Sequence, residues 1–309
     1  MAHITPRVDI AFKKIFGVEE NKDLLIALIN SIVSEDDQVA DITLLNPYNA
    51  KNFKQDKLSI LDIKAQGLDG TRFNIEIQIC DEADYPKRAL YYWAKLYTEQ
   101  LKESADYGML SKTIGIHILN FTSLPESDKY HNVFRIIEED NGLKYFEDLE
   151  LHTIELKKFT SSVDNVTDLV AKIKTSLDVW VAFLTKHNLF DKDHLPDKLK
   201  NSGLKKALDV LEVMNFSEEE REGYEDHLKW LRMQMNTLKK YEQLAREEGE
   251  AIGEARGKAI GEARGKAIGE AEKGLKVAKK LIKLGCAIEI IIEATGLTRN
   301  EIEKMKEND

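Results

Sequence analysis

The stretch LSILDIKAQGLDGTRFNIEIQIC, residues 58–80, decides the fold that we expect for this chain. Apolar and polar side chains alternate in both halves, which is the period-two pattern of β-strands with one apolar and one polar face. For the two apolar faces to coincide, Ile63 must lie opposite Ile75, because a slip of one residue would turn every side chain over. The stretch is therefore predicted to form a β-hairpin that turns at residues 68–70, with Gly70 in a left-handed conformation.

The polar face of this hairpin carries an acidic pair. In the predicted register Asp62 lies directly opposite Glu76, with about 5 Å between their Cβ atoms, and Gln78 follows on the same face. Two facing carboxylates repel unless a cation lies between them, and a divalent metal ion meets that need. A solvated hairpin edge is the alternative. The β-branched arms and the amphipathic helix that follows favour a covered sheet, on which unpaired charge is costly.

The order of these residues resembles the PD-(D/E)XK nuclease superfamily and, more narrowly, the recombination-promoting nuclease (Rpn) / putative transposase family. The resemblance rests on Asp62, on the Glu-x-Gln of the next strand and on the helix YPKRALYYWAKLYTEQL. PRVDIAFKKIFG near the start, LELHTIELKKF at residues 149–159 and the Gly/Glu/Arg-rich segment near the end also match. The implied fold is α/β: a restriction-endonuclease-like mixed sheet flanked by helices, followed by an all-helical C-terminal region.

The resemblance implies a DNA endonuclease that hydrolyses phosphodiester bonds with Mg²⁺ or Mn²⁺, in recombination, transposition or mobile-element biology. Asp62 and Glu76 fall at the metal-binding acids of the family. Asp9 is implied to complete the metal shell, and the alternative is that it caps the helix beginning there. Gln78 falls where much of the superfamily has Lys, and it brings hydrogen bonds without charge. Lys64, on the face of Asp62, is expected to supply that charge in catalysis, unless it is a solvated strand lysine.

A nuclease-fold protein that has lost catalysis and serves as a binding or assembly module is the second hypothesis. Intact Asp62 and Glu76 favour the nuclease, whereas Gln78 in place of Lys keeps the alternative open. The net charge of −10 argues mildly against a nucleic-acid binder. Arg88 and Lys95, two turns apart on one helix face, are the predicted contacts to DNA, with a solvated helix surface as the alternative.

The length and composition of the chain predict its domain organisation and its cellular location. Its 309 residues suit one domain plus an appendage. Without a signal peptide or a twenty-residue apolar run, we expect no membrane contact and a cytoplasmic location. Cys80 and Cys286 lack the spacing of a metal site and are expected to be buried thiols. A homodimer is expected because it suits double-strand cutting.

Four regions are predicted along the chain. Residues 1–160 form the nuclease-like domain, and residues 161–248 form a helical region with a 3.6-residue apolar period. Residues 249–274 repeat an eight-residue unit, in which the five glycines at every fourth position from 253 to 269 cost a helix about 4 to 5 kcal/mol. A fraying helical tether is favoured over a stripe for close helix contact. Residues 275–309 form a helix-turn-helix-like tail, which either places Arg299 against DNA or serves dimerisation.

Periodicity also predicts the individual elements of the first three regions. We expect strands over residues 40–46, 112–121, 134–137 and 151–156, in addition to the hairpin. We expect helices over residues 9–33, 86–104, 164–184, 196–215 and 217–248.

Overall fold

The computed structural model describes residues 4–47, 62–81, 84–101, 106–160, 163–200, 202–212, 214, 216 and 218–307. The chain divides into two compact units, Met1–Met235 and Asn236–Asp309. The first unit holds the sheet and the candidate site. The second unit holds part of a long helix and the helical tail.

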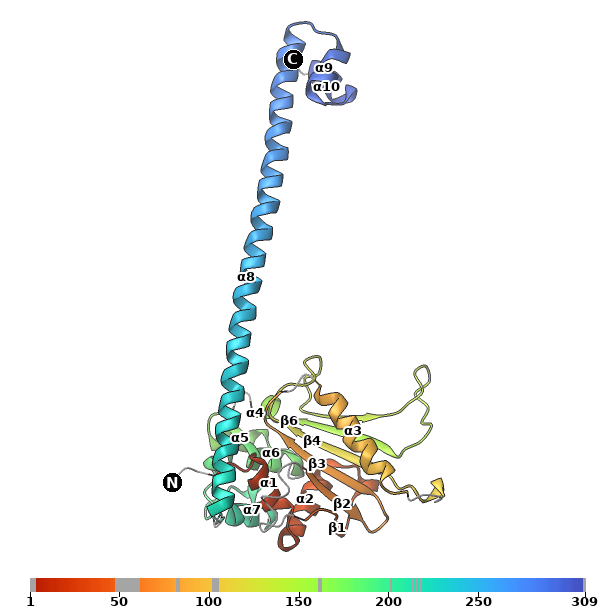
Figure 1. Cartoon of the computed structure of the whole chain (residues 1–309), viewed down its shortest axis with the longest axis vertical. Coiled ribbons are helices and arrows are strands. Elements are labelled where there is room, and N and C mark those ends of the chain that lie inside the picture. Colours follow the sequence, from red (N-terminus) through yellow and green to blue (C-terminus); the bar gives the residue numbers. More distant parts are fainter. Residues whose placement is uncertain are drawn as a thin grey trace. The chain divides into compact units, whose positions relative to one another are not determined.

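The described part of the first unit is built on one six-stranded mixed sheet in the order β1-β2-β3-β4-β6-β5 (Figure 1). Its strands are β1 (Ile42–Leu44), β2 (Asp62–Gly67), β3 (Arg72–Gln78), β4 (Thr113–Leu119), β5 (His131–Arg135) and β6 (Leu149–Glu155). β3, β4 and β6 run parallel to one another, whereas β1, β2 and β5 pair antiparallel with their neighbours. The predicted mixed α/β sheet is confirmed.

The β2–β3 hairpin has the predicted register. Ile63 pairs with Ile75 and Asp62 pairs with Glu76. Gly70 takes a left-handed conformation with φ of +92°, and a side chain there would collide with Ser111. The part of the predicted first arm that precedes Asp62 lies outside the described residues.

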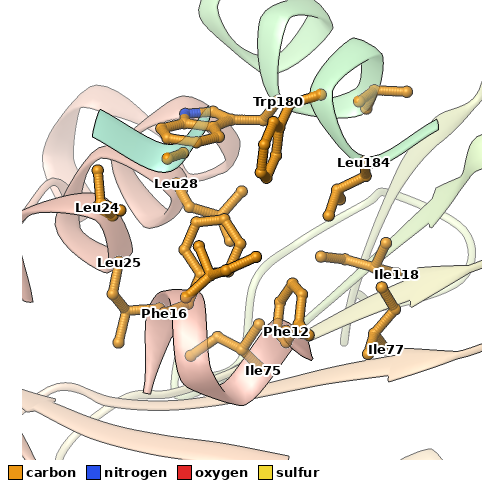
Figure 2. Packing of buried hydrophobic residues seen from close by; sticks show 14 of the residues in the cluster. Phe12, Phe16, Leu24, Leu25, Leu28, Ile75, Ile77, Ile118, Trp180 and Leu184 are labelled. Atoms are coloured by element: carbon orange, nitrogen blue, oxygen red, sulfur yellow. The ribbon is translucent and has the colours of Figure 1, made fainter. Parts of the chain in front are cut away.

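The apolar face of the sheet forms the core of the first unit together with the helices that cover it. Helices α1 (Asp9–Phe16), α2 (Lys22–Ile32) and α6 (Ser176–Lys186) contribute to this core. Figure 2 shows Phe12 and Phe16 of α1 between Ile75 and Ile77 of β3 on one side and Trp180 of α6 on the other. Phe16 and Trp180 meet edge to face, with ring centroids 5.5 Å apart. The predicted boundary at residue 160 therefore lies within one shared core.

Several predicted helices are shorter or divided in the structure. The helix expected over residues 9–33 breaks after Phe16, because the chain turns at Gly17 and a 3₁₀ turn precedes α2. A Cβ at Gly17 would lie 2.8 Å from the Lys13 carbonyl oxygen, which is too close for any other residue. The remaining helices of the first unit are α3 (Tyr85–Thr98), α4 (Leu156–Thr160), α5 (Val166–Lys172) and α7 (Ser202–Glu212).

The polar face of the sheet is covered by α3 (Figure 1). Tyr85 and Ala89 of this helix pack on Leu119 and Phe121 at the end of β4. Trp93 donates a hydrogen bond from its indole nitrogen to the Thr113 carbonyl oxygen, 2.6 Å away. The expected covering of the charged hairpin face by the following helix is thus confirmed.

The second unit contains the repeat and the tail. Helix α8 (Glu218–Lys283) continues without a break through the repeat. A stripe of glycines at spacing four turns by about 40° with each step around a helix of 3.6 residues per turn. The stripe therefore winds around the helix, and Ile252, Ile260 and Ile268 are exposed.

The predicted helical tail is also observed in the second unit. Helices α9 (Ile288–Thr295) and α10 (Arg299–Glu307) follow turns at Gly285 and Gly296, both with positive φ. Ala278, Ile291 and Ile302 form the buried centre of this small bundle. Arg299 lies in an ion pair with Glu289, at 2.6 Å. None of the helices in the described ranges combines the length and the apolar character needed to cross a membrane.

The shared core predicts that α6 is essential for the stability of the sheet. Trp180→Ala should lower the free energy of unfolding by about 3 to 5 kcal/mol, because it removes a buried indole from a packed core. Urea unfolding followed by circular dichroism measures the change. Tyr241→Ala, at an exposed position of α8, is the matched control and should stay within about 0.5 kcal/mol of the parent. Equal stabilities of the two variants would contradict the shared core.

Candidate active site

The polar face beneath α3 buries an acidic side chain that has a histidine as its neighbour. Glu76 of β3 is only 2% exposed, and its register partner on β4 is the equally buried His117. A buried carboxylate is costly unless a cation or hydrogen-bond donors face it. The groups that contact the Glu76 carboxylate therefore determine the chemistry that this site can support.

Arg88 of α3 is the cation that meets this carboxylate. Its Nη2 donates to Oε1 of Glu76 and to Oε1 of Gln78, each at 2.8 Å. Its guanidinium also lies 5.0 Å from the ring centroid of Tyr85, at cation–π distance. Gln78 in turn donates from Nε2 to the Cys80 carbonyl oxygen at 3.2 Å. Arg88, predicted to contact DNA, has its head group inside the acidic site.

Asp9 brings a second buried carboxylate to the same place. The residue is 8% exposed and stands at the first position of α1, after Val8 at the N-cap. The N-cap alternative for Asp9 is therefore wrong. Burial, with the negative charge of Glu76 as the next cause, raises the pKa of Asp9 to about 7, although Arg88 acts in the opposite direction. Asp9 and Glu76 thus act on each other electrostatically, as expected of two residues in one acidic site.

The structure gives the other predicted site residues different surroundings. The backbone of β2 places Asp62 opposite Glu76, and the side chain of Asp62 is outside the described atoms. Lys64 lies beside Glu99 at the end of α3, with Nζ 3.8 Å from Oε2. Lys95 shares this partner, with its Nζ 3.9 Å from Oε1 of Glu99. Asp9, Glu76, Gln78 and Arg88 are therefore brought together, whereas Lys64 and Lys95 meet at Glu99.

A cavity of about 70 Å³ lies next to this acidic site. Its lining combines residues from four segments: Asp9, Gln78, Ile79, Cys80, Arg88, His227, Trp230 and Leu231. A water molecule occupies about 30 Å³ in the liquid, so the space suits an ion with part of its hydration shell or a small polar group. The sequence did not suggest the α8 residues, because their place beside Asp9 depends on the tertiary packing of a helix far along the chain.

His227 and Trp230 form the α8 side of this cavity. Nε2 of His227 is 3.5 Å from Oδ2 of Asp9, and burial lowers the pKa of the imidazole. The rings of His227 and Trp230 have centroids 5.5 Å apart. The first turns of α8 therefore complete the wall of the site, a role that the predicted helical region did not include.

Tyr85 and His117 are a further pair that sequence reasoning missed. The Tyr85 hydroxyl and Nδ1 of His117 are 2.9 Å apart, and the same nitrogen is 3.8 Å from Oε2 of Glu76. Burial, followed by the charges of Arg88 and His152, lowers the pKa of His117 to about 4, so the imidazole is neutral near pH 7. The available signal was a lone histidine in the apolar strand TIGIHIL.

The donor set of this site suits a hard divalent cation. Asp9 and Glu76 offer carboxylate oxygens, which Mg²⁺ and Mn²⁺ prefer, and Asp62 is the register partner of Glu76 on β2. Within the described residues, no three His, Cys, Asp or Glu side chains are gathered as a ready metal cluster. A third carboxylate would therefore come from Asp62. The mutual effect of Asp9 and Glu76 supports the fit, because a cation between them would relieve it.

A scan against protein families agrees with this geometry. The family described as PD-(D/E)XK nuclease family transposase matches residues 6–241. The chain belongs to this family. Comparisons with curated proteins and with solved structures found no match. The matched range contains Asp9, Glu76, Arg88 and the α8 residues of the cavity wall. Membership in the PD-(D/E)XK nuclease family associates the chain with nuclease and transposase chemistry, and such nucleases generally use divalent metals.

The raised pKa of Asp9 predicts a pH-dependent stability for this PD-(D/E)XK protein when metal is absent. A carboxyl whose pKa rises from 3.8 to about 7 on folding binds its proton more tightly in the folded state. Stability is therefore lost as the pH rises from about 4 to 7. Asp9→Asn should remove this loss, so the variant should exceed the parent at pH 8 by on the order of a few kcal/mol and match it at pH 4.

Urea unfolding in EDTA at several pH values tests this expectation. The matched control is Asp36→Asn, which exchanges an exposed carboxylate for an amide outside the site. An Asp9→Asn variant that is less stable than the parent at pH 8 would show that the ionised carboxylate is favourably held in the fold.

Proposed function

We propose that this chain is a divalent-metal-dependent DNA endonuclease that hydrolyses phosphodiester bonds, with a role in recombination, transposition or another mobile-element process. The observation that carries the proposal is a pair of buried carboxylates, Asp9 and Glu76, that act on each other electrostatically, with Asp62 opposite Glu76 in the sheet. A buried carboxyl whose pKa is raised by burial and by a neighbouring carboxylate, as that of Asp9 is, is characteristic of a functional centre. Membership in a nuclease family supports the same chemistry.

In this proposal Asp62, Glu76 and Asp9 hold Mg²⁺ or Mn²⁺ through carboxylate oxygens. The bound ion supplies a water of lowered pKa and neutralises charge at the phosphate. Gln78 contributes hydrogen bonds at the rim of the cavity and no charge. His117 is neutral and hydrogen-bonded with Tyr85, so it limits the positions open to the neighbouring Glu76 carboxylate.

DNA is the proposed substrate, and a homodimer is the proposed assembly because two copies can cut both strands. Lys95 is 52% exposed on α3 and remains a candidate for contact with the DNA backbone. Lys64, expected to supply catalytic charge, is kept as a lesser candidate, because its ammonium lies beside Glu99. The inactive binding module is the alternative that Gln78 favours, since a lysine is missing from the usual position.

Cleavage of supercoiled plasmid with and without Mg²⁺ or Mn²⁺ tests the proposed function. The parent should nick DNA only with metal, and Asp62→Ala and Glu76→Gln should each lose about 10²-fold or more in rate, because each removes a metal ligand. The matched control is Glu126→Gln, an exposed carboxylate outside the site, which should cleave like the parent. A folded parent that is inactive with every divalent metal would support the binding module instead. Cleavage that survives Asp62→Ala and Glu76→Gln would place the active centre elsewhere.

A further inference from the structure

The proposed metal site has a charge requirement that its carboxylates and metal do not meet. Three carboxylates and one divalent ion sum to −1 when all three acids are ionised, and a phosphodiester adds another negative charge. Hydrolysis develops still more charge on the phosphate oxygens in the transition state, so a fixed cation beside them accelerates it. Gln78 occupies the position from which a lysine would supply this charge, and an amide cannot do so.

The guanidinium of Arg88 lies where this positive charge is needed. It donates from one nitrogen to both Glu76 and Gln78 at 2.8 Å, and it lines the cavity that Asp9 also lines. Its side chain is 25% exposed, so it is held by the site and still accessible from the cavity. Stacking against the Tyr85 ring adds a third constraint on the guanidinium. A cation constrained in this way needs little reorganisation when a phosphate binds.

The other cations that the structure describes near this site pair with acidic residues outside it or act more weakly on Asp9. The ammonium groups of Lys64 and Lys95 both lie beside Glu99, and that of Lys14 pairs with Glu220 at 2.9 Å. Lys13, one turn after Asp9 on α1, has a smaller effect on the Asp9 carboxyl than Arg88 has. Among the residues that the structure describes, Arg88 is therefore the cation most closely coupled to the acidic centre.

We propose that Arg88 is a catalytic residue that supplies the positive charge absent at Gln78; this inference rests on the proposed hydrolase function. Arg88 donates to a non-bridging oxygen of the scissile phosphate as water attacks phosphorus. The new bond joins the water oxygen to phosphorus, and the bond to the leaving sugar oxygen breaks. One proton of the water passes to that leaving oxygen, directly or through solvent. Arg88 keeps its protons throughout, because a guanidinium does not deprotonate in proteins.

The same geometry gives Gln78 a distinct role as the acceptor that orients Arg88. Its amide has a fixed direction, because Oε1 accepts from Arg88 and Nε2 donates to the Cys80 carbonyl. A lysine ammonium at position 78 would repel the guanidinium at this distance. Positions 78 and 88 thus form a coupled pair in which one cation is accommodated and two are not.

Variants that move the positive charge from position 88 to position 78 test the proposal. Arg88→Gln should lower kcat for metal-dependent cleavage by about 10²-fold or more, with Mn²⁺ affinity unchanged or tighter because a competing cation is gone. Gln78→Lys alone should also lower kcat. The double variant Arg88→Gln with Gln78→Lys should regain at least about tenfold over Arg88→Gln, because one cation is restored to the site. Arg88→Lys should fall between the parent and Arg88→Gln.

The control for this series is Lys87→Gln, the neighbouring position on α3. Lys87 is 86% exposed and paired with Asp84, so its removal should leave cleavage within about twofold of the parent. Thermal unfolding of every variant separates loss of fold from loss of rate. Parent-like cleavage by a folded Arg88→Gln, or a double variant no better than Arg88→Gln, would overturn the role of Arg88 and leave the proposed function standing. A parent that neither binds Mn²⁺ nor cleaves would overturn both.

Discussion

The burial of the Glu76 carboxylate beneath α3 is the constraint on which the rest of the site depends. A sheet covered on both faces excludes water, so a charged side chain at its centre must be given partners by the fold. Arg88 of α3 donates a hydrogen bond to this carboxylate, and the His117 imidazole of β4 lies 3.8 Å from it. The helix α3 is consequently fixed over the sheet by polar as well as apolar contacts, and the fold and the proposed chemistry share the same residues.

The local sequence pattern predicted the features of the fold that depend on residues close together in the sequence. The alternation of apolar and polar residues predicted that Asp62 lies opposite Glu76, because only one register places the apolar residues of both strands on the same face. Gly70 indicated the position of the turn. The family resemblance extended this to a mixed sheet and to membership in a nuclease family, both confirmed. The roles of Lys64 and Arg88 could not be separated, because both are cations near the acidic pair in sequence and only the rotation of α3 over the sheet distinguishes them.

Tertiary packing accounts for what the sequence could not predict. His227 reaches Asp9 only because the first turns of α8 pack within the first unit, where Tyr224 joins the core. The close approach of the chain to the Lys13 carbonyl at Gly17, where the helix ends, leaves no room for a Cβ, and periodicity does not predict it. The region past residue 160 was predicted as a separate helical region, and its Trp180 lies in the core that the sheet shares. A nuclease domain that ends at residue 160 would lack both this core contact and one wall of the site.

Locating the metal directly is the measurement that tests the central claim. A crystal structure of the chain grown with Mn²⁺ would show the ion by its anomalous scattering. The account predicts one ion bound by oxygen atoms of Asp62 and Glu76, with Asp9 in or beside its shell and Arg88 still within hydrogen-bond reach of Gln78. Saturating Mn²⁺ that leaves the Glu76–Arg88 ion pair unchanged, with no ion between the carboxylates, would contradict it.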